Sequence, residues 1–553
     1  MKIKLKTKTA VGKPNKTESK NPEGQLRGTV DYFAQGKFTL HPHQVDGVRW
    51  LLEKELAGYK LGGILGDDPG LGKTIQIAAL IYGNKGQCPV ETTLIVVPVS
   101  VLVQWKEVMN YVVGEENVYI HVGNKRAKGS EIKEQCNGKL VCLTTYGVLT
   151  QDSIYKVGEK ETKGHFAIHN WHRIVLDEGH QIRNPKTKIS KVARILSAQY
   201  RWILSGTPIQ NSSGDIATLM KFIGVPKMKV EDLVSEFMLR RTKEILYSAG
   251  LLDRFTIVNH SCEFTTGYEQ ELYKAIQDQT MYEYSQLETS KGISQMMLLE
   301  LMIRLRQAAI HPDIALKSLH TKYPETGFDK LKMDTKKIPT KIFHMIEEVK
   351  KTKGMSLVFT HFRHEMDYIK SKLRENNIFA ECYNGGQLVS ERKKILGKFK
   401  YSNFKKFKVS GKKCVPIPPS ESRPTVLIIQ IKAGGVGLNL QKFSNVFFVS
   451  PDWNPANEIQ AIARAHRIGQ DKKVNVHKFT LISNPEFVRE SEEFSDSDEE
   501  EDFPTTFTTI DERILRTQKN KRTIMEDILV DSSFKFNELF TSYTKNITEL
   551  SRT

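Results

Sequence analysis

The sequence predicts an α/β protein with two parallel β-sheets and a helical insertion between them. Three observations support this fold class. Short apolar segments alternate with helical stretches from residue 40 onward, a second such series begins at residue 356, and the residues between the two series carry a helical pattern. With 553 residues, the chain is also too long for a single hydrophobic core.

The first series of strands defines an N-terminal lobe over residues 38–225. Its strands are expected at Leu94–Val97, Val141–Thr145, Ile174–Leu176 and Trp202–Leu204. Before this lobe, residues 1–37 contain alternating lysines and little hydrophobic pattern, so we expect a basic flexible arm. A short strand in the same residues is the alternative.

The rest of the chain divides by composition. In residues 226–333 strand signals vanish and apolar residues recur at helical spacing, which predicts a helical insertion and linker. Residues 334–485 are expected to form the second α/β lobe. Residues 486–506 contain a dense acidic block and are expected to be disordered, whereas residues 507–553 are expected to form a helical segment and tail.

Charge and cysteine content limit the function classes. The formal net charge of +18 favours a polyanionic partner, with solubility alone as the alternative explanation. The six cysteines are scattered without a Cys-x-x-Cys pair, which argues for a reducing compartment and against zinc-finger chemistry, so we expect no zinc. We expect neither a membrane span nor a secretion signal, because no long apolar run is present.

A glycine-rich loop lies between the apolar segment 61–65 and an apolar-periodic stretch that begins at Ile75. Glycines let backbone N–H groups surround phosphate oxygens, and the N-terminus of the following helix adds positive potential. Lys73 can then reach the β- and γ-phosphates of ATP, and Thr74 can hold Mg²⁺. The strict pattern has glycine where this chain has Asp67. The expected ATP-binding residues of the loop are Asp67, Asp68, Pro69, Gly70, Leu71, Gly72, Lys73 and Thr74.

A second pattern places two carboxylates at the end of an apolar strand, in Ile174-Val-Leu-Asp177-Glu178. Parallel α/β sheets bind their ligands at the carboxyl ends of the strands. Asp177 can bind Mg²⁺ through water, and Glu178 can orient or activate an attacking water. A simple strand cap is the alternative interpretation.

Together with further segments, these patterns resemble the Swi/Snf-type superfamily 2 helicase-like ATPases, a family of chromatin remodellers and DNA translocases. Gln44 stands where this family reads adenine. The run from Asp177 to His180 resembles its Asp-Glu-x-His box, with Gly179 where alanine is usual, a difference of one methyl that we expect to be tolerated. The segment Ser205, Gly206 and Thr207 resembles the motif that couples hydrolysis to DNA. The resemblance implies two RecA-like lobes.

The second lobe resembles the family in its last two motifs. Lys432 to Leu440 resembles the fifth motif, which adds Gly437 to the expected ATP contacts. The segment from Gln460 to Gln470 resembles the sixth motif, and the resemblance implies that Arg464 and Arg467 act as arginine fingers. Because they are three residues apart, we expect both on one face of a helix. The alternative is a pair of surface salt bridges.

The resemblance also implies residues that contact DNA. The candidates are Pro98, Gln104, Trp105, Thr145, Lys432 and Trp453. For the two tryptophans, packing in the core is the alternative, because aromatic side chains are more often buried. Contacts are expected mainly with the phosphate backbone, so sequence specificity should be low.

The sequence therefore predicts a DNA-dependent ATPase that uses ATP and Mg²⁺ to move along double-stranded DNA and to remodel or displace protein–DNA complexes. Candidate targets are nucleosomes and the transcription machinery, in transcription or DNA repair. Such a protein would act in a nucleus or another intracellular site that contains DNA, including a viral factory. The alternatives are a strand-separating helicase and a nucleotide-switched DNA-binding scaffold.

Overall fold

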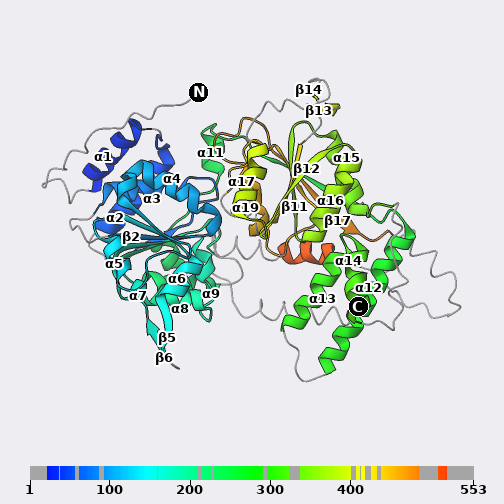
Figure 1. The fold of residues 1–553 in the computed structure, drawn as a ribbon, viewed down its shortest axis with the longest axis horizontal. Coiled ribbons are helices and arrows are strands. Elements are labelled where there is room, and N and C mark those ends of the chain that lie inside the picture. Colours follow the sequence, from blue (N-terminus) through cyan, green and yellow to red (C-terminus); the bar gives the residue numbers. More distant parts are fainter. Residues whose placement is uncertain are drawn as a thin grey trace. The chain divides into compact units, whose positions relative to one another are not determined.

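The structure is a computed structural model in which the chain divides into two compact units, residues 1–245 and 246–553. It describes residues 22–36, 38–56, 62–85, 92–157, 160–208, 213–225, 230–289, 295–322, 337–399, 407–410, 413–416, 425–431, 438–484 and 508–519. The two units are described separately below (Figure 1).

The first unit is built on a seven-stranded sheet in the order β3-β4-β2-β7-β8-β1-β9, and all of its neighbouring strands are parallel. Strands β2 and β4 are buried along their whole length, and β2 is almost entirely Leu, Ile and Val, as expected for a parallel sheet covered on both faces. In order, the strands are β1 Gly63–Leu65, β2 Thr93–Val97, β3 Val118–His121, β4 Val141–Thr145, β7 Asn170–Asp177, β8 Ser197–Leu204 and β9 Met238–Leu239.

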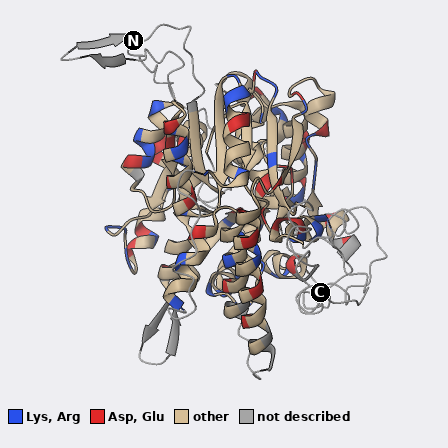
Figure 2. Ribbon diagram, turned by 90° about the vertical axis from the view of Figure 1, so that its right-hand side faces the viewer, with Lys and Arg blue, Asp and Glu red and all other residues tan. Residues whose placement is uncertain are grey.

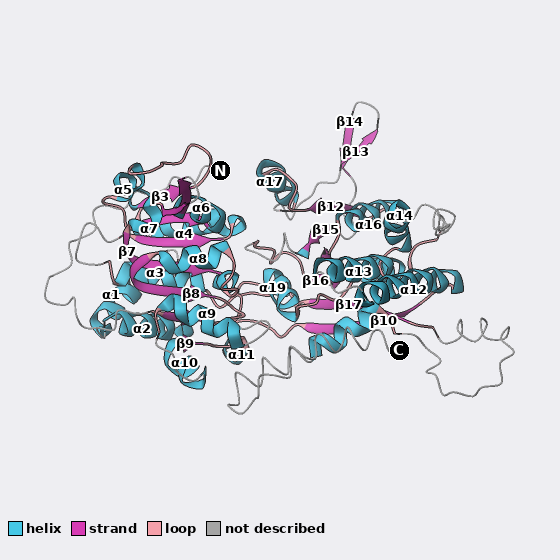
Figure 3. Cartoon of the chain, turned by 90° about the horizontal axis from the view of Figure 1, so that it is seen from below, coloured by secondary structure: helices cyan, strands magenta, loops and turns pink. Residues whose placement is uncertain are grey.

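Helices flank this sheet and connect its strands (Figure 3). The α-helices of the first unit are α1 Pro22–Ala34, α2 Pro42–Leu56, α3 Lys73–Gly83, α4 Leu102–Val113, α5 Glu131–Cys136, α6 Tyr146–Ser153, α7 His165–Ile168, α8 Lys188–Ile195, α9 Ser213–Ile223, α10 Val230–Phe237 and α11 Glu244–Ser248, the last of which runs into the second unit. Three short 3₁₀ helices lie at η1 Val99–Val101, η2 Glu115–Asn117 and η3 Gly179–Ile182, and β5 Ile154–Val157 pairs with β6 Lys160–Lys163 in a hairpin.

Strand register brings three loops to one edge of the first sheet. Leu65 of β1 is paired with Leu204 of β8, and Leu204 is paired with Asp177 of β7. The segments that follow these three residues therefore leave the sheet side by side at its carboxyl edge. They contain the glycine-rich loop, the Asp-Glu pair and the Ser-Gly-Thr segment.

The second unit contains a six-stranded parallel sheet in the order β10-β17-β16-β11-β15-β12. Its strands are β10 Thr256–Glu263, β11 Met355–Thr360, β12 Phe379–Tyr383, β15 Thr425–Gln430, β16 Asn445–Phe448 and β17 Asn475–Ile482, and β13 Phe407–Ser410 pairs with β14 Lys413–Pro416 in a separate hairpin. Its helices are α12 Gly267–Thr289, α13 Gln295–Ala308, α14 Pro312–Lys322, α15 Thr340–Lys351, α16 Arg363–Glu375, α17 Val389–Lys398 and α19 Pro455–Ala465.

The predicted fold class, α/β with two RecA-like parallel-sheet lobes and helices inserted in the chain between them, is confirmed. Within the range 226–333, however, two segments are strands rather than helices. β9 pairs with β1 in the first sheet, and β10 pairs with β17 in the second. Neither strand alternates clearly in polarity; β9 has two residues, and β10 is a largely exposed strand with a mixed sequence. Their pairing depends on neighbours far away in the chain.

The ends of the chain are partly described. Residues 1–21 of the expected basic arm lie outside the described residues, but residues 22–34 form helix α1, which buries Leu26 and Phe33. The expectation of an arm without structure is therefore wrong for this part, since apolar residues at helical spacing tie it to the lobe. The acidic block at 486–506 lies outside the described residues. A helix spans 510–519 and buries Ile510 and Ile514 against α12–α14.

Two further features concern the surface of the described residues. Basic and acidic residues are interspersed over their helices rather than segregated (Figure 2). Among the described residues, no helix is long and apolar enough to cross a membrane.

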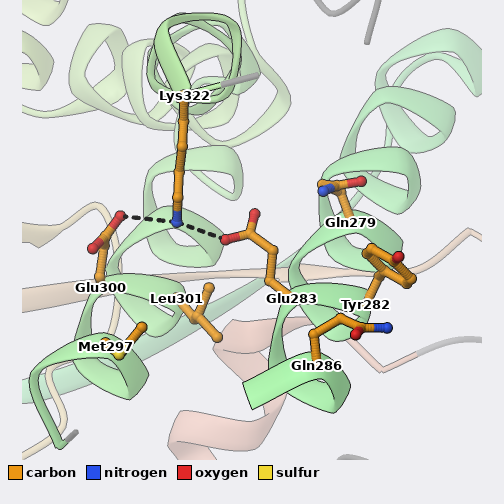
Figure 4. A pocket seen from close by; sticks show the side chains of 8 residues that line it. All are labelled: Gln279, Tyr282, Glu283, Gln286, Met297, Glu300, Leu301 and Lys322. Carbon is orange, nitrogen blue, oxygen red and sulfur yellow. Dashed lines mark hydrogen bonds and ion pairs between the residues drawn. The ribbon is translucent and has the colours of Figure 1, made fainter. Parts of the chain in front are cut away.

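A pocket of about 320 Å³ opens between α12, α13 and α14, where Lys322 points between Glu283 and Glu300, at N···O distances of 2.9 and 3.8 Å (Figure 4). None of its lining residues belongs to the patterns singled out from the sequence.

Candidate nucleotide site

The glycine-rich loop joins β1 to α3, and its backbone has the conformations that glycine permits. Gly70 and Gly72 have φ angles of 102° and 86°, and α3 begins directly afterwards at Lys73. A side chain at position 72 would also collide with its surroundings, because a Cβ there would lie 2.2 Å from Nε2 of Gln44. Gly72 is therefore required by both backbone geometry and space.

Two residues of α2 brace this loop from one side. Nε2 of Gln44 donates a hydrogen bond to the Leu71 carbonyl at 3.2 Å, and Nε2 of His43 lies 3.1 Å from the same oxygen. Oε1 of Gln44 accepts from the His41 amide at 3.0 Å. The structure thus brings the expected adenine-reading residue, Gln44, against the phosphate loop. The bracing contact from His43 was not expected from the sequence.

The aspartate at the usual glycine position has a structural partner. Asp67 is fully buried, and its carboxylate forms an ion pair with Arg241 at 2.5 Å. Nε2 of Gln76 donates to the same carboxylate at 3.0 Å. Arg241 follows β9 and is far from the loop in sequence, so its pairing with Asp67 could not be predicted from the sequence. The contact explains how a charged residue is accommodated here, because a buried carboxylate needs a paired cation.

Asp68 and the segment after β9 extend this bracing. The Asp68 amide donates to the Arg241 carbonyl at 2.9 Å, and the Lys243 amide donates to Oδ2 of Asp68 at 3.1 Å. The Gly66 amide donates to the Leu239 carbonyl at 2.7 Å. The loop is therefore held at its start by a strand that the sequence did not indicate.

Lys73 lies at the first position of α3, surrounded by oxygen atoms. Its Nζ donates to the carbonyls of Asp67 and Asp68, at 2.5 and 3.3 Å. Burial lowers the pKa of Lys73, while the negative charge of Glu178, and more weakly of Asp67 and Asp177, acts in the opposite direction. The lysine is thus placed among the groups that a nucleotide phosphate and its metal ion would contact. Thr74 follows it and is partly exposed.

At the end of β7, the Asp177 carboxylate is held by Trp105 of α4, whose indole Nε1 donates to Oδ2 at 2.7 Å. The hydroxyl of Tyr146 donates to the backbone carbonyl of Asp177 at 2.7 Å. Burial and the neighbouring Glu178 charge raise the pKa of Asp177 to about 6. The sequence did not suggest that Trp105 and Tyr146 position this residue.

Glu178 has an unusual backbone and an unsatisfied carboxylate. Its φ and ψ of 52° and 46° lie in the left-handed region, where a residue other than glycine is uncommon. Its Oε2 is buried and forms no hydrogen bond with the described residues, although it lies 3.4 Å from Nδ1 of His180. Burial lowers the pKa of His180 to about 4, so this imidazole is neutral at pH 7 and does not compensate the carboxylate charge.

The segment of Ser205, Gly206 and Thr207 contacts both the Asp-Glu-x-His box and the glycine-rich loop. Oγ of Ser205 shares a hydrogen bond of 3.1 Å with Nδ1 of His180 and accepts from the Thr207 amide at 3.2 Å. A Cβ at Gly206 would lie 2.6 Å from Cδ of Pro69 in the phosphate loop. The residues expected to couple hydrolysis to DNA therefore touch both halves of the candidate ATP site.

Gly179 is more restricted than the sequence suggested. A Cβ at this position would lie 2.7 Å from Cγ2 of Ile203, which is fully buried in β8. The methyl that most relatives are expected to carry here would therefore displace Ile203 in this chain. Glycine fits because the β-branched neighbour occupies that space.

In the second unit, Arg464 lies in the last turn of α19, which ends at Ala465. Arg467 lies beyond the helix end, so the expectation that both arginines occupy one face of a helix is wrong. The two remain close, since the Arg464 charge lowers the pKa of Arg467 after the larger effect of burial. The Arg467 guanidinium has no hydrogen-bond or ion-pair partner among the described residues. Gly437 and Lys432 lie outside those residues.

The candidate DNA contacts differ in accessibility. Trp105 is 1% exposed and Thr145 is 5% exposed, so neither side chain is available to DNA in this structure. For Trp105 the reason is its packing beneath the acidic strand end. Pro98 and Gln104 are partly exposed in the first unit. Trp453 is partly buried and packs against the apolar cluster of α12–α14 in the second unit.

Comparisons with known proteins identify the family that the chain resembles. The model of the SNF2-related domain matches residues 43–231, and that of the helicase conserved C-terminal domain matches residues 340–469. A viral protein of Orgyia pseudotsugata multicapsid polyhedrosis virus, called "Probable global transactivator", is 28% identical over 462 residues, which cover 80% of this chain and 86% of that protein.

Human DNA excision repair protein ERCC-6 is 26% identical over 583 residues, which cover 91% of this chain but 34% of its own length. The chain thus spans most of the viral relative and about a third of the human one. A solved structure of the Sulfolobus solfataricus SWI2/SNF2 ATPase core in complex with dsDNA is 26% identical, with 82% of this chain and 90% of that chain covered and a TM-score of 0.36.

Proposed function

The chain belongs to the Swi/Snf-type, SNF2-related family of helicase-like ATPases, and on this premise we propose that it is an ATP-dependent translocase on double-stranded DNA that remodels or displaces protein–DNA complexes. One observation carries the catalytic part of this proposal. A glycine-rich loop, a partly buried lysine and two carboxylates meet at one edge of one parallel sheet, where Oε2 of Glu178 forms no hydrogen bond with the described residues.

Each group has a role that fits its surroundings. Lys73 would neutralise the β- and γ-phosphates, and Gln44 would read the base beside the loop. Oxygen atoms of Thr74 and Asp177 would hold Mg²⁺, which prefers such hard ligands and shields phosphate charge when bound. Glu178 would orient the attacking water, since its Oε2 is buried and forms no hydrogen bond with the described residues.

The second lobe would complete the chemistry. Arg467 is largely withdrawn from water, lies near a second arginine and has no anionic partner among the described residues. Such a cation is stabilised by an incoming anion, which supports its role as an arginine finger for the γ-phosphate, alone or with Arg464. Hydrolysis would then require the lobes to close, and closure would drive movement along DNA.

DNA is proposed as the partner from the basic charge and the family. The net charge of +18 favours phosphate contacts, which give affinity without sequence specificity. Pro98, Gln104 and Trp453 are the described candidates that are partly exposed. Lys432, which lies outside the described residues, remains a further candidate. A polymerase, a nucleosome or another bound protein would be the target, in a nucleus or a viral factory. ERCC-6 bears the name of a DNA excision repair protein, and the viral relative that of a transactivator.

The test is steady-state ATP hydrolysis without nucleic acid and with single-stranded DNA, duplex DNA, RNA or nucleosomes. Duplex DNA should raise the rate by about tenfold or more, a barrier change of at least about 1.4 kcal/mol. Equal rates in all conditions would contradict the proposal. Displacement of a third strand from a DNA triplex, without unwinding of a forked duplex, would separate translocation from the helicase alternative. Tight DNA binding without turnover would support the scaffold alternative.

A further inference from the structure

Three potential metal ligands meet within the second unit, outside the residues assigned to ATP or DNA. They are His260 of β10, Glu348 of α15 and His477 of β17, and their ligand atoms all lie within 4.8 Å of one another. The two imidazoles are already in contact, with Nε2 of His260 at 3.1 Å from Nδ1 of His477.

The fold brings these residues together because β10 and β17 are adjacent parallel strands. Val258 is paired with His477, and His260 is paired with Phe479. The two histidines are therefore offset by two residues along the strands, and both lie on the same face of the sheet. Helix α15 covers this face and packs Met345, Ile346 and Val349 into the cluster that includes Phe479. Glu348 lies beside these apolar positions, at the edge where the helix crosses the two strands.

Two neighbours shape the cluster further. His344 lies one turn before Glu348 on α15. Lys351 forms an ion pair with Oε1 of Glu348 at 2.5 Å, and its side chain is 68% exposed. This lysine competes for the carboxylate but can move into solvent.

We propose that His260, His477 and Glu348 form a binding site for a transition-metal dication, with Zn²⁺ as the favoured ion. Two imidazole nitrogens and one carboxylate oxygen are a ligand set that zinc accepts. At zinc–nitrogen bonds of about 2.0–2.1 Å in tetrahedral geometry, two nitrogens lie about 3.3 Å apart, close to the spacing observed here. Mg²⁺ is disfavoured because it prefers oxygen ligands in octahedral geometry.

The expectation of no zinc rested on cysteine spacing alone. The three ligands come from elements that are remote in sequence, so no short motif reports them. A bound ion would connect α15 to β10 and β17 and would stabilise the second unit increasingly as the free ion concentration rises above the Kd. The site belongs to the fold of one lobe and stands independently of the proposed DNA translocase activity.

The test uses the full chain, stripped with a chelator and titrated with Zn²⁺ alone, in competition with a chromophoric chelator. The double substitution His260→Gln/Glu348→Gln removes two ligands and preserves side-chain size. It should weaken the site by more than the 10–100-fold that a second-shell change costs, here about 100-fold or more. His364→Gln removes an exposed histidine of the same unit and is the matched control. It should bind Zn²⁺ as the wild type does.

Lys351→Ala supplies a test in the opposite direction. Removing the competing ammonium should tighten Zn²⁺ binding, whereas Lys350→Ala, which breaks the analogous pair with Glu347 at 2.6 Å, should not. X-ray absorption at the zinc edge should show nitrogen and oxygen ligands at about 2.0–2.1 Å and no sulfur at about 2.3 Å. Equal Zn²⁺ affinity for the wild type and the double variant, sulfur ligation, or equal affinity for Mg²⁺ would overturn the proposal.

Discussion

At the scale of single residues, Glu178 carries two costs at once. Its backbone is held in the left-handed region at φ 52°, a conformation that costs about 1–3 kcal/mol for such a residue. Its Oε2 is buried without a hydrogen bond from the described residues. Both are explained if the carboxylate is aimed at a group that joins the site during catalysis, such as the attacking water.

Lys73→Ala and Glu178→Gln should therefore fail in different ways. The first removes a phosphate-binding charge, so the affinity for ATP should fall. The second preserves shape but removes the water-orienting charge, so ATP should bind normally and persist unhydrolysed. Nucleotide binding and single-turnover hydrolysis on both variants measure this, with Glu115→Gln, an exposed glutamate of the same unit, as the control. Normal turnover by Glu178→Gln would refute the assigned role.

Trp105→Phe should change the pH dependence of hydrolysis. Burial and the Glu178 charge raise the pKa of Asp177 to about 6, although the indole hydrogen bond acts in the opposite direction. Without the bond the pKa of Asp177 should rise further, and more of this carboxyl would be protonated and unable to hold Mg²⁺ near pH 6–7. The acidic limb of kcat/KM should therefore move to higher pH, because that profile reports groups of the free enzyme. An unchanged limb would remove Trp105 from this positioning role.

Gly179→Ala should destabilise the first unit. The new methyl would lie 2.7 Å from Cγ2 of Ile203, and overpacking of a buried site costs about 1–3 kcal/mol. Ile203→Leu moves the branch away from the clash, so the alanine should cost less in that background. Thermal unfolding of the two single variants and the double variant gives the coupling. Strictly additive effects would show that the fold relaxes around the methyl in another way.

At the scale of elements, the end of α19 holds the candidate arginine in place. After the helix ends, Nε2 of His466 lies 2.7 Å from the Asp253 carbonyl. Nε2 of Gln470 donates to the carbonyls of Gln441, Phe443 and Ala465 at 2.7, 3.2 and 3.0 Å. The segment between these two anchors contains Arg467. Because this segment is held at both ends, the Arg467 guanidinium would lose little conformational entropy on binding an anion.

Arg467→Ala should therefore leave ATP and DNA binding within a few-fold and reduce hydrolysis by about 10³ or more if the residue acts as a finger. Arg467→Lys should restore little of the hydrolysis rate, because the planar fork of the guanidinium is lost. Arg374→Ala, on the exposed face of α16, is the control. Rapid hydrolysis by Arg467→Ala would leave Arg464 as the remaining candidate in this lobe.

At the scale of the whole molecule, charge is unevenly distributed along a basic chain. Residues 490–502, which lie outside the described residues, contain nine carboxylates in thirteen positions, although the net charge of the chain is +18. An acidic segment tethered between β17 and the helix at 510–519 would compete with DNA phosphates for basic side chains. A solvated linker is the simpler alternative.

Replacing residues 490–502 by a Gly/Ser segment of equal length should tighten duplex DNA binding at low salt. The gain should fade as salt increases, because the Debye length falls from about 30 Å at 0.01 M to about 8 Å at 0.15 M. DNA affinity measured across this range decides the matter. Unchanged affinity at low ionic strength would reduce the block to a linker.

The sequence by itself determined the features that depend on neighbouring residues. Alternating apolar strands and helices predicted the parallel sheets, and local spacing indicated the candidate phosphate loop at Lys73 and the candidate carboxylates Asp177 and Glu178. Tertiary structure decided which partners these residues meet. The Asp67–Arg241 ion pair, the Trp105–Asp177 hydrogen bond and the cluster of His260, Glu348 and His477 each join residues remote in sequence. Such contacts depend on strand order and helix packing, which place distant segments side by side and leave no periodic signal in the chain.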